Sequence, residues 1–300
     1  MSLQDVKDVL EYLLTPSLPV IIVGLLIVFI APILVHLFIS RSTPYTSLPT
    51  ILLAGPPGAG KTSLLTLLER GDSAAGTHTS QRPHAIELTV SDHPGASTFR
   101  EAARDDAPGS HKKFLLIDTP GHGKLRRHAL AQLGGDGKSS KKSQTPFGDS
   151  AMLRGVVYIL DAATMDDSLA DAATYLYDIL LSLQKRAGAG RTSRAPHSVH
   201  VLIAANKLDL FTALPASLVR TGLEAELGRI RQSRSKGLLD SGVGTDDVGS
   251  EEQDNWLGDY GSEKFSFSQM REFEMEVDVI GGSVLEQNVD KWWEWIAQRI

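Results

Sequence analysis

The sequence contains no cysteine, which excludes disulfide bonds and thiolate metal sites and fits a reducing compartment. It also lacks a basic run long enough to form a nucleic-acid footprint. Its 30 Lys and Arg residues are outnumbered by 36 Asp and Glu residues, which gives a net charge of −6. We therefore expect no direct binding of nucleic acid. What the chain does have is 42% hydrophobic content over 300 residues, enough for a substantial core.

One segment lacks formal charge altogether. Residues 18–39 read LPVIIVGLLIVFIAPILVHLFI, and at about 1.5 Å per residue a helix of this length crosses a hydrocarbon layer of about 30 Å. The preceding flank is acidic and no small-residue cleavage site follows, which disfavours a cleaved signal peptide. The sequence predicts a transmembrane helix here. Lys7 and Arg41 nearly balance, so charge alone does not decide its orientation.

The most specific motif is Gly-Pro-Pro-Gly-Ala-Gly-Lys-Thr at residues 55–62, directly after the apolar run 51–54. Between a strand and a helix, this pattern forms a phosphate cradle from backbone N–H groups and the helix N-terminus. Lys61 is predicted to reach the outer phosphates and the Thr62 hydroxyl to bind Mg²⁺. The predicted contacts in this segment are Gly55, Pro56, Pro57, Gly58, Ala59, Gly60, Lys61, Thr62 and Ser63.

Two later motifs, Asp118-Thr-Pro-Gly121 and Asn206-Lys207-Leu-Asp209, also follow predicted strands. A carboxylate such as Asp209 can accept two hydrogen bonds from the guanine edge, which adenine does not offer. The three motifs in this order predict GTP and Mg²⁺ as ligands. They disfavour an ATP-dependent kinase, which would use the same phosphate loop.

Alternating apolar strands and helices predict an α/β fold of the P-loop NTPase G-domain type, with a mostly parallel sheet flanked by helices and one N-terminal transmembrane helix. We expect an N-terminal segment at 1–17, the span at 18–39, a linker at 40–49 and one domain at 50–300. Residues 134–148 and 233–264 are rich in Gly, Ser and charged residues and are predicted to be flexible insertions. Strands are expected at 50–54, 85–90, 113–117, 155–160, 200–205 and 274–280, and a closing amphipathic helix at 289–300.

The order of these parts resembles the beta subunit of the signal recognition particle receptor, a membrane-anchored family related to the Arf and Sar small GTPases. The resemblance covers nearly all of residues 18–300. Thr77-His-Thr79-Ser80 is similar to the family's Thr-x-Thr-Ser switch segment, and Asp118-Thr-Pro-Gly-His122 is similar to its Asp-x-Pro-Gly-His. Residues 174–180 and 290–296 also look like its later helices.

The resemblance implies roles for the metal and γ-phosphate contacts. Thr62 and Thr79 would complete the Mg²⁺ shell, Asp118 would hold the ion through a water, and the Gly121 N–H would sense the γ-phosphate. The hydroxyls of Thr77 and Ser80 lie beside Thr79 in sequence and remain alternatives.

His122 stands where many small GTPases have a Gln that orients the attacking water. Two interpretations stay open: a catalytic, water-positioning imidazole, or a His that packs or binds a partner. Slow GTP hydrolysis is expected in either case. A departure from related proteins lies at 279–283, where Val-Ile-Gly-Gly-Ser replaces Ser-Ala-Lys, and the N–H groups of Gly281 and Gly282 are predicted to meet the guanine O6.

The resemblance implies a regulatory binding module. GTP would order the switch loops, which would then hold the N-terminal domain of the receptor's alpha subunit at the endoplasmic reticulum membrane for co-translational targeting. Residues 41–300 are expected in the cytosol, where GTP is plentiful, and contact of the insertions with ribosome or translocon is left open. The alternative is a membrane-tethered GTPase that cycles by hydrolysis in vesicle traffic.

Overall fold

The computed structural model describes residues 18–42, 48–71, 76–91, 111–133, 152–188, 198–240, 256–258, 262 and 264–300. The chain divides into two compact units, residues 1–46 and 47–300. The predicted N-terminal segment 1–17 and the first predicted insertion, 134–148, lie outside the described residues.

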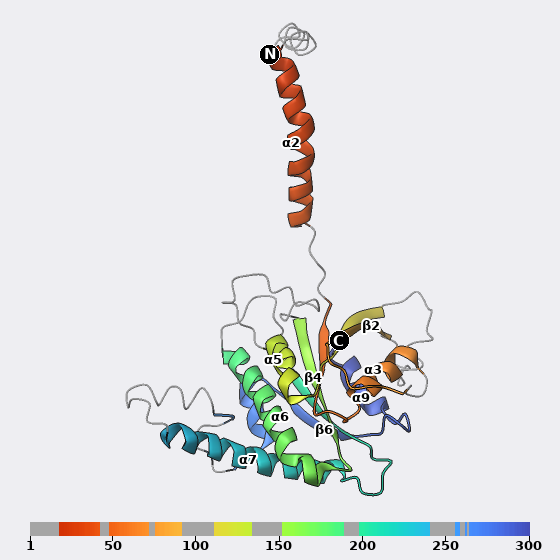
Figure 1. Cartoon of the computed structure of the whole chain (residues 1–300), viewed down its shortest axis with the longest axis vertical. Helices are drawn as coiled ribbons and strands as arrows, with labels where there is room; N and C mark the ends of the chain where they lie inside the picture. The colour runs from red at the N-terminus through yellow and green to blue at the C-terminus, as the bar shows by residue number, and fades with distance from the viewer. Residues whose placement is uncertain are drawn as a thin grey trace. The chain divides into compact units, whose positions relative to one another are not determined.

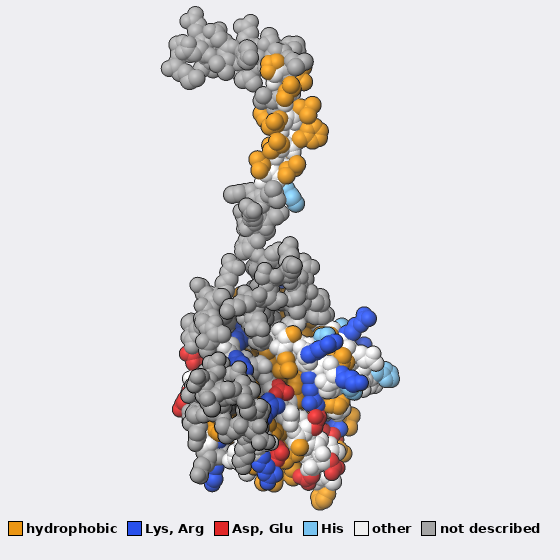
Figure 2. Space-filling model, turned by 60° about the vertical axis from the view of Figure 1, so that its left-hand side comes forward, with side chains coloured by type: hydrophobic (Ala, Val, Ile, Leu, Met, Phe, Trp, Pro, Cys, Tyr) orange, Lys and Arg blue, Asp and Glu red, His pale blue; other side chains and the backbone are white. Residues whose placement is uncertain are grey.

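The first unit contributes one helix, α2 (Leu18–Ser42), which confirms a helix over the predicted segment. Pro32 lies inside it. Figure 2 shows hydrophobic side chains along its surface, and the described large ones are between 43% and 67% exposed: Ile21, Ile22, Leu25, Leu26, Ile27, Val28, Phe29, Ile30, Ile33, Leu34 and Val35. None of the helices in the described part of the chain combines the length and the hydropathy that crossing a membrane requires.

The second unit is built on a six-stranded sheet with the order β2-β3-β1-β4-β5-β6. Only the β2–β3 pair is antiparallel, so the predicted mostly parallel sheet is confirmed. All five residues of β1 are buried, as expected for a strand covered on both faces. The strands are β1 (Thr50–Ala54), β2 (His84–Ser91), β3 (His111–Asp118), β4 (Leu153–Asp161), β5 (His200–Asn206) and β6 (Val277–Gly281).

Helices cover both faces of this sheet (Figure 1). One core cluster joins the sheet to α5, α6 and α7, and the other joins it to α3 and α9. This is the layered arrangement of a G domain. The helices are α3 (Lys61–Arg70), α5 (Arg127–Leu133), α6 (Met165–Gly188), α7 (Ala216–Asp240) and α9 (Asp290–Ala297), with 3₁₀ turns η1 (Gly123–Leu125) and η3 (Phe267–Phe273).

Two elements differ from the sequence-based expectation. Strand β6 begins at Val277 rather than at Glu274, because Glu274 has a φ of 57° that is incompatible with extended backbone. The second predicted insertion, 233–264, is corrected at its ends: residues 233–240 continue α7, and Leu257 is fully buried. Gln184 of α6 fixes residues 256–258, because its side chain donates to the Trp256 carbonyl and accepts from the Gly258 N–H.

The parallel strands bring the three sequence motifs to one edge of the sheet. Leu53 pairs with Asp118 and Asp161 pairs with Asn206, so the carboxyl ends of β1, β3, β4 and β5 lie side by side. Ligands of open α/β sheets bind outside this edge.

Candidate nucleotide-binding site

A cavity of about 240 Å³ opens at this edge and is lined by three of the predicted segments. They are the phosphate loop with the start of α3, the segment 77–80 and Gly121. The base-recognition residues do not line it, so the cavity corresponds to the phosphate half of a nucleotide site. The lining residues are Pro57, Gly58, Gly60, Lys61, Thr62, Ser63, Thr77, His78, Thr79, Ser80 and Gly121.

Glycines shape the phosphate loop because two of its close approaches leave no room for a side chain. Gly55, Gly58 and Gly60 have φ values of 140°, 75° and 102°, which L side chains rarely adopt. A Cβ on Gly55 would lie 2.0 Å from the Ile159 carbonyl oxygen, and one on Gly60 would lie 2.3 Å from the Asn206 amide nitrogen. No side chain of the described residues caps the α3 N-terminus at Gly60, which leaves its first turn suited to an anion.

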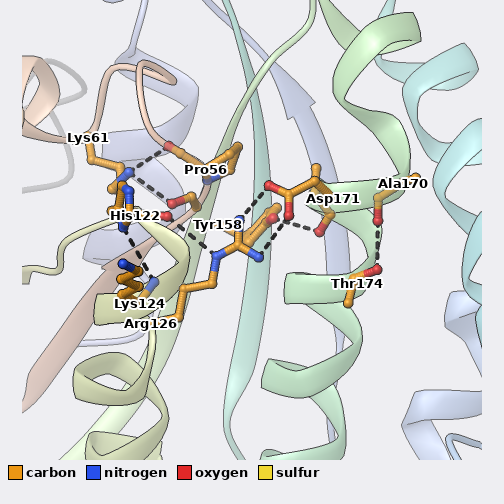
Figure 3. A network of polar contacts seen from close by, with 12 residues as sticks. Pro56, Lys61, His122, Lys124, Arg126, Tyr158, Ala170, Asp171 and Thr174 are labelled. Atoms are coloured by element: carbon orange, nitrogen blue, oxygen red, sulfur yellow. Dashed lines mark hydrogen bonds and ion pairs between the residues drawn. The ribbon is translucent and has the colours of Figure 1, made fainter.

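The Lys61 ammonium is held inside the cavity mouth. Its Nζ donates to the carbonyl oxygens of Gly55 at 2.9 Å and Pro56 at 2.7 Å, as Figure 3 shows. Burial lowers the pKa of Lys61 to about 8; the Asp118 charge opposes this effect and Arg126 adds to it. An anion placed here would gain a nearly dehydrated positive charge.

Thr62 and Asp118 form the candidate Mg²⁺ site. The Thr62 hydroxyl donates to Asp118 Oδ2 at 2.7 Å. Burial raises the pKa of Asp118, while the Thr62 hydrogen bond, the Lys61 charge and the Ser80 hydroxyl act in the opposite direction. The other oxygen, Oδ1, is buried without a hydrogen-bond partner in the described part of the chain.

This donor set fits Mg²⁺. The described residues hold no group of three or more His, Cys, Asp or Glu side chains that could ligate a metal. Mg²⁺ typically retains waters and takes substrate phosphates with only one or two protein oxygens, so a hydroxyl and a carboxylate beside a phosphate cradle are sufficient.

The segment 77–80 brings all three candidate hydroxyls to the cavity. Thr77 Oγ1 lies 2.9 Å from Ser63 Oγ and is hydrogen-bonded to it. Thr79 and Ser80 also line the cavity. The three hydroxyls therefore lie at the cavity, and the choice of Thr79 as the metal ligand stays a prediction.

Gly121 lies buried against the phosphate loop. A Cβ at this position would lie 2.6 Å from both Lys61 Nζ and the Gly55 carbonyl oxygen, so only glycine fits. The preceding Thr119 anchors the loop, because its hydroxyl donates to the Leu53 carbonyl at 2.6 Å. Its contact with the γ-phosphate stays a prediction.

His122 is exposed and does not line the cavity. It is the N-cap residue of η1, and its Nδ1 accepts the Lys124 N–H at 3.4 Å (Figure 3). The structure thus assigns the imidazole a capping contact. Its role in hydrolysis stays a prediction.

Asn206 joins the phosphate loop to the loop after β6. Its amide donates to the Ala59 carbonyl at 2.8 Å, and its carbonyl oxygen accepts the Val284 N–H at 3.0 Å. The next residue, Lys207, pairs with Asp161 at 2.5 Å. Burial alone would raise the pKa of Asp161, but the Lys207 contact and the Ala163 N–H lower it.

Ser283 is a site residue that sequence reasoning missed. Its hydroxyl donates to Asp209 Oδ1 at 2.6 Å and accepts the Glu286 N–H at 3.1 Å, so it fixes the carboxylate predicted to read the base. The sequence does contain a signal for this role, because Ser283 is the one polar side chain in Val279-Ile-Gly-Gly-Ser283.

The predicted base contact of Gly282 needs correction. Its N–H donates to the Ala205 carbonyl at 2.9 Å and is not available to guanine. Both glycines allow close packing instead: a Cβ on Gly281 would lie 2.3 Å from Leu208 Cδ1, and one on Gly282 would lie 2.6 Å from the Asn288 carbonyl. The Gly281 contact with the base stays a prediction.

The chain is similar in sequence to known proteins. The signal recognition particle receptor subunit beta of Saccharomyces cerevisiae is 29% identical over 254 residues, 84% of each chain. The human subunit beta is 29% identical over 292 residues, 94% of this chain and 88% of that one.

Solved structures of the receptor from Chaetomium thermophilum are also similar. The SRb-GTP/SRX complex has a TM-score of 0.69 at 42% identity and covers 84% of this chain and 100% of that chain. The SRb-GDP-Mg structure has a TM-score of 0.59 at 44% identity and covers 86% and 100%. A family model described as signal recognition particle receptor beta subunit matches residues 46–273, and the chain belongs to this family.

Proposed function

We propose that this chain binds GTP with Mg²⁺ and, in that state, holds the alpha subunit of the signal recognition particle receptor at the endoplasmic reticulum membrane for co-translational targeting. The carrying observation is that Lys61, Thr62 and Gly121 line one cavity, with Asp118 hydrogen-bonded to Thr62. The similarity to a receptor structure that contains GTP and SRX supports both the ligand and the partner.

In this proposal, Lys61 and the backbone N–H groups of residues 55–61 hold the β- and γ-phosphates. Thr62 and Asp118 would hold Mg²⁺, which would supply positive charge beside the phosphates. Asp209, fixed by Ser283, accepts the hydrogens of the guanine edge.

The chain is similar to solved receptor structures in both nucleotide states. The chain has a TM-score of 0.69 with the SRb-GTP/SRX complex, and 0.58 and 0.59 with the SRb-GDP and SRb-GDP-Mg structures of the same organism. All three structures contain a guanine nucleotide by their titles, which supports a guanine nucleotide as the ligand of this chain.

Binding of the alpha subunit should depend on the nucleotide. We expect immobilised N-terminal domain of the alpha subunit to retain the full chain, in detergent, with a non-hydrolysable GTP analogue and Mg²⁺, and to lose it with GDP or without nucleotide. The reason is that only the third phosphate can engage the Gly121 loop. Equal retention in all three states would contradict nucleotide-dependent binding. Absence of binding in every state would show that the alpha subunit is not the partner.

Helix α2 is proposed to be the membrane anchor, with residues 41–300 in the cytosol. Support comes from the uncharged sequence 18–39 and from the apolar side chains that α2 exposes. We expect the full chain to stay in the membrane pellet after alkaline carbonate extraction, and its G domain to be digested by protease added to sealed microsomes. Release into the supernatant would disprove the anchor, and protection of the G domain would disprove the orientation.

Membership of the receptor family favours this function over the vesicle-traffic alternative. Contacts of the two insertions with the ribosome or translocon stay a proposal, and no surface of the described residues is assigned to them. Single-turnover hydrolysis, measured with and without the alpha subunit, would test whether slow GTP turnover accompanies binding.

A further inference from the structure

Arg126 connects the Gly121 loop to helix α6. Its Nε donates to the Gly121 carbonyl at 3.4 Å, and its two terminal nitrogens donate to the two carboxylate oxygens of Asp171, one of them at 3.0 Å. Figure 3 shows this guanidinium between the loop and the helix. A fork of this kind fixes direction as well as distance, which a lysine could not do.

The platform behind Arg126 is rigid. The guanidinium lies over the Tyr175 ring, 4.6 Å from its centre, and the Arg126 side chain is only 15% exposed. Tyr175 in turn packs edge-on against Tyr158, whose hydroxyl donates to the Ala172 carbonyl at 2.8 Å. Both tyrosine rings are fully buried, so movement of Arg126 would disturb the core.

The loop held in this way is the one that closes on the phosphate cradle. Gly121 touches Lys61 and the Gly55 carbonyl so closely that no Cβ fits. Arg126 itself does not line the cavity, and it therefore acts through the position of Gly121.

We propose that Arg126 and Asp171 form a latch that positions the Gly121 loop for the third phosphate, and that the preference of this chain for GTP over GDP depends on this latch. The inference rests on the proposed function, because it assumes that the Gly121 N–H meets the γ-phosphate. GDP has no group at that place. Loss of the latch therefore weakens GTP binding and leaves GDP binding nearly unchanged, since a contact shifts a preference only when the two ligands use it differently.

The test compares the dissociation constants of a fluorescent non-hydrolysable GTP analogue and of fluorescent GDP, with Mg²⁺, for the full chain in detergent. For Arg126→Ala and Asp171→Asn we expect the GTP-to-GDP affinity ratio to fall about tenfold, the size of effect that a partly exposed bidentate ion pair carries. Arg126→Lys should restore little of the ratio because it lacks the fork. Arg127→Ala, an exposed neighbouring arginine, is the matched control and should leave the ratio unchanged.

The outcomes separate the latch from its alternatives. Equal weakening of GTP and GDP would mean that the pair only stabilises the fold, and an unchanged ratio would overturn the latch directly. Arg126→Ala combined with Asp171→Asn should lower the ratio no further than Arg126→Ala alone, because the second change removes a contact that the first has already removed. If Arg126→Ala lowers the melting temperature, the affinity ratio of Asp171→Asn is used instead, because the Asp171 side chain is 63% exposed and its change should not affect folding. A wild-type chain that fails to bind GTP at all would refute the proposed function itself.

Discussion

Asp209→Asn is expected to lower GTP affinity by about 100-fold or more and to allow XTP to bind in its place, because a site built to hydrogen-bond one edge strongly rejects a mismatched one. The Ser283 hydroxyl occupies one acceptor site on Oδ1 of Asp209, which leaves the remaining acceptor sites of the carboxylate for the two hydrogens of the guanine edge. An asparagine there presents N–H donors, which suit the 2-oxo group of xanthine and repel the amino group of guanine. Competition between GTP and XTP for the full chain measures the exchange.

Ser283→Ala is the companion variant for this prediction. It removes the hydroxyl that orients the Asp209 carboxylate and keeps the charge, so we expect about a tenfold loss of GTP affinity and no gain of XTP. If Asp209→Asn kept its preference for guanine, other residues would recognise the base. If ATP bound instead of XTP, an ATP-dependent enzyme would again have to be considered.

Lys61→Met is expected to weaken GTP and GDP alike by about a thousandfold, because truncating one partner of a buried charge pair costs several kcal/mol. The two nucleotides should respond together since both carry a β-phosphate in reach of this ammonium. Isothermal titration with each nucleotide measures the loss. Lys124→Met, which removes an exposed lysine outside the cavity lining, is the control and should bind normally. Retention of GDP by the Lys61 variant would place the phosphates in another part of the cavity.

Raising the pH removes the same positive charge, because it deprotonates Lys61. With the pKa of Lys61 near 8 in the unliganded chain, nucleotide affinity should be flat below pH 8 and fall as pH rises above it, because only the ammonium form binds phosphate. Stability of the unliganded chain should change in the opposite sense. Between pH 8 and 10.5 the unfolded chain still holds the proton and the folded chain does not, so folding becomes more favourable as pH rises. Both trends should disappear in Lys61→Met.

Local patterns were sufficient to predict the sheet and the phosphate loop. An apolar run followed by Gly55 to Thr62 determines a strand, a turn and a helix start within a dozen residues. The parts that were missed depend on contacts between distant positions. Ser283 meets Asp209 across 74 positions and Arg126 meets Asp171 across 45, and no periodicity reports such pairs.

Composition describes a segment as a whole and does not identify its individual anchored residues. The segment 233–264 has few apolar residues, which predicts a flexible insertion, and among its described residues Leu257 is fully buried. Arg231 of α7 donates to the Leu257 carbonyl and lies over the Trp256 ring, 4.6 Å from its centre. These contacts hold residues 256 and 257, and the average composition of the segment does not report them.

The Asn206 side chain, which hydrogen-bonds on both sides of its amide, also affects how the two ends of a nucleotide bind. Because one side chain ties Ala59 of the cradle to Val284 beside the base loop, the subsites for the two ends of a nucleotide are kept at a fixed separation before anything binds. A guanosine and a pyrophosphate offered as separate fragments would each lose their own freedom of motion. Joined in one molecule, they lose translational and rotational freedom only once. The intact nucleotide should therefore bind more tightly than its two fragments do separately.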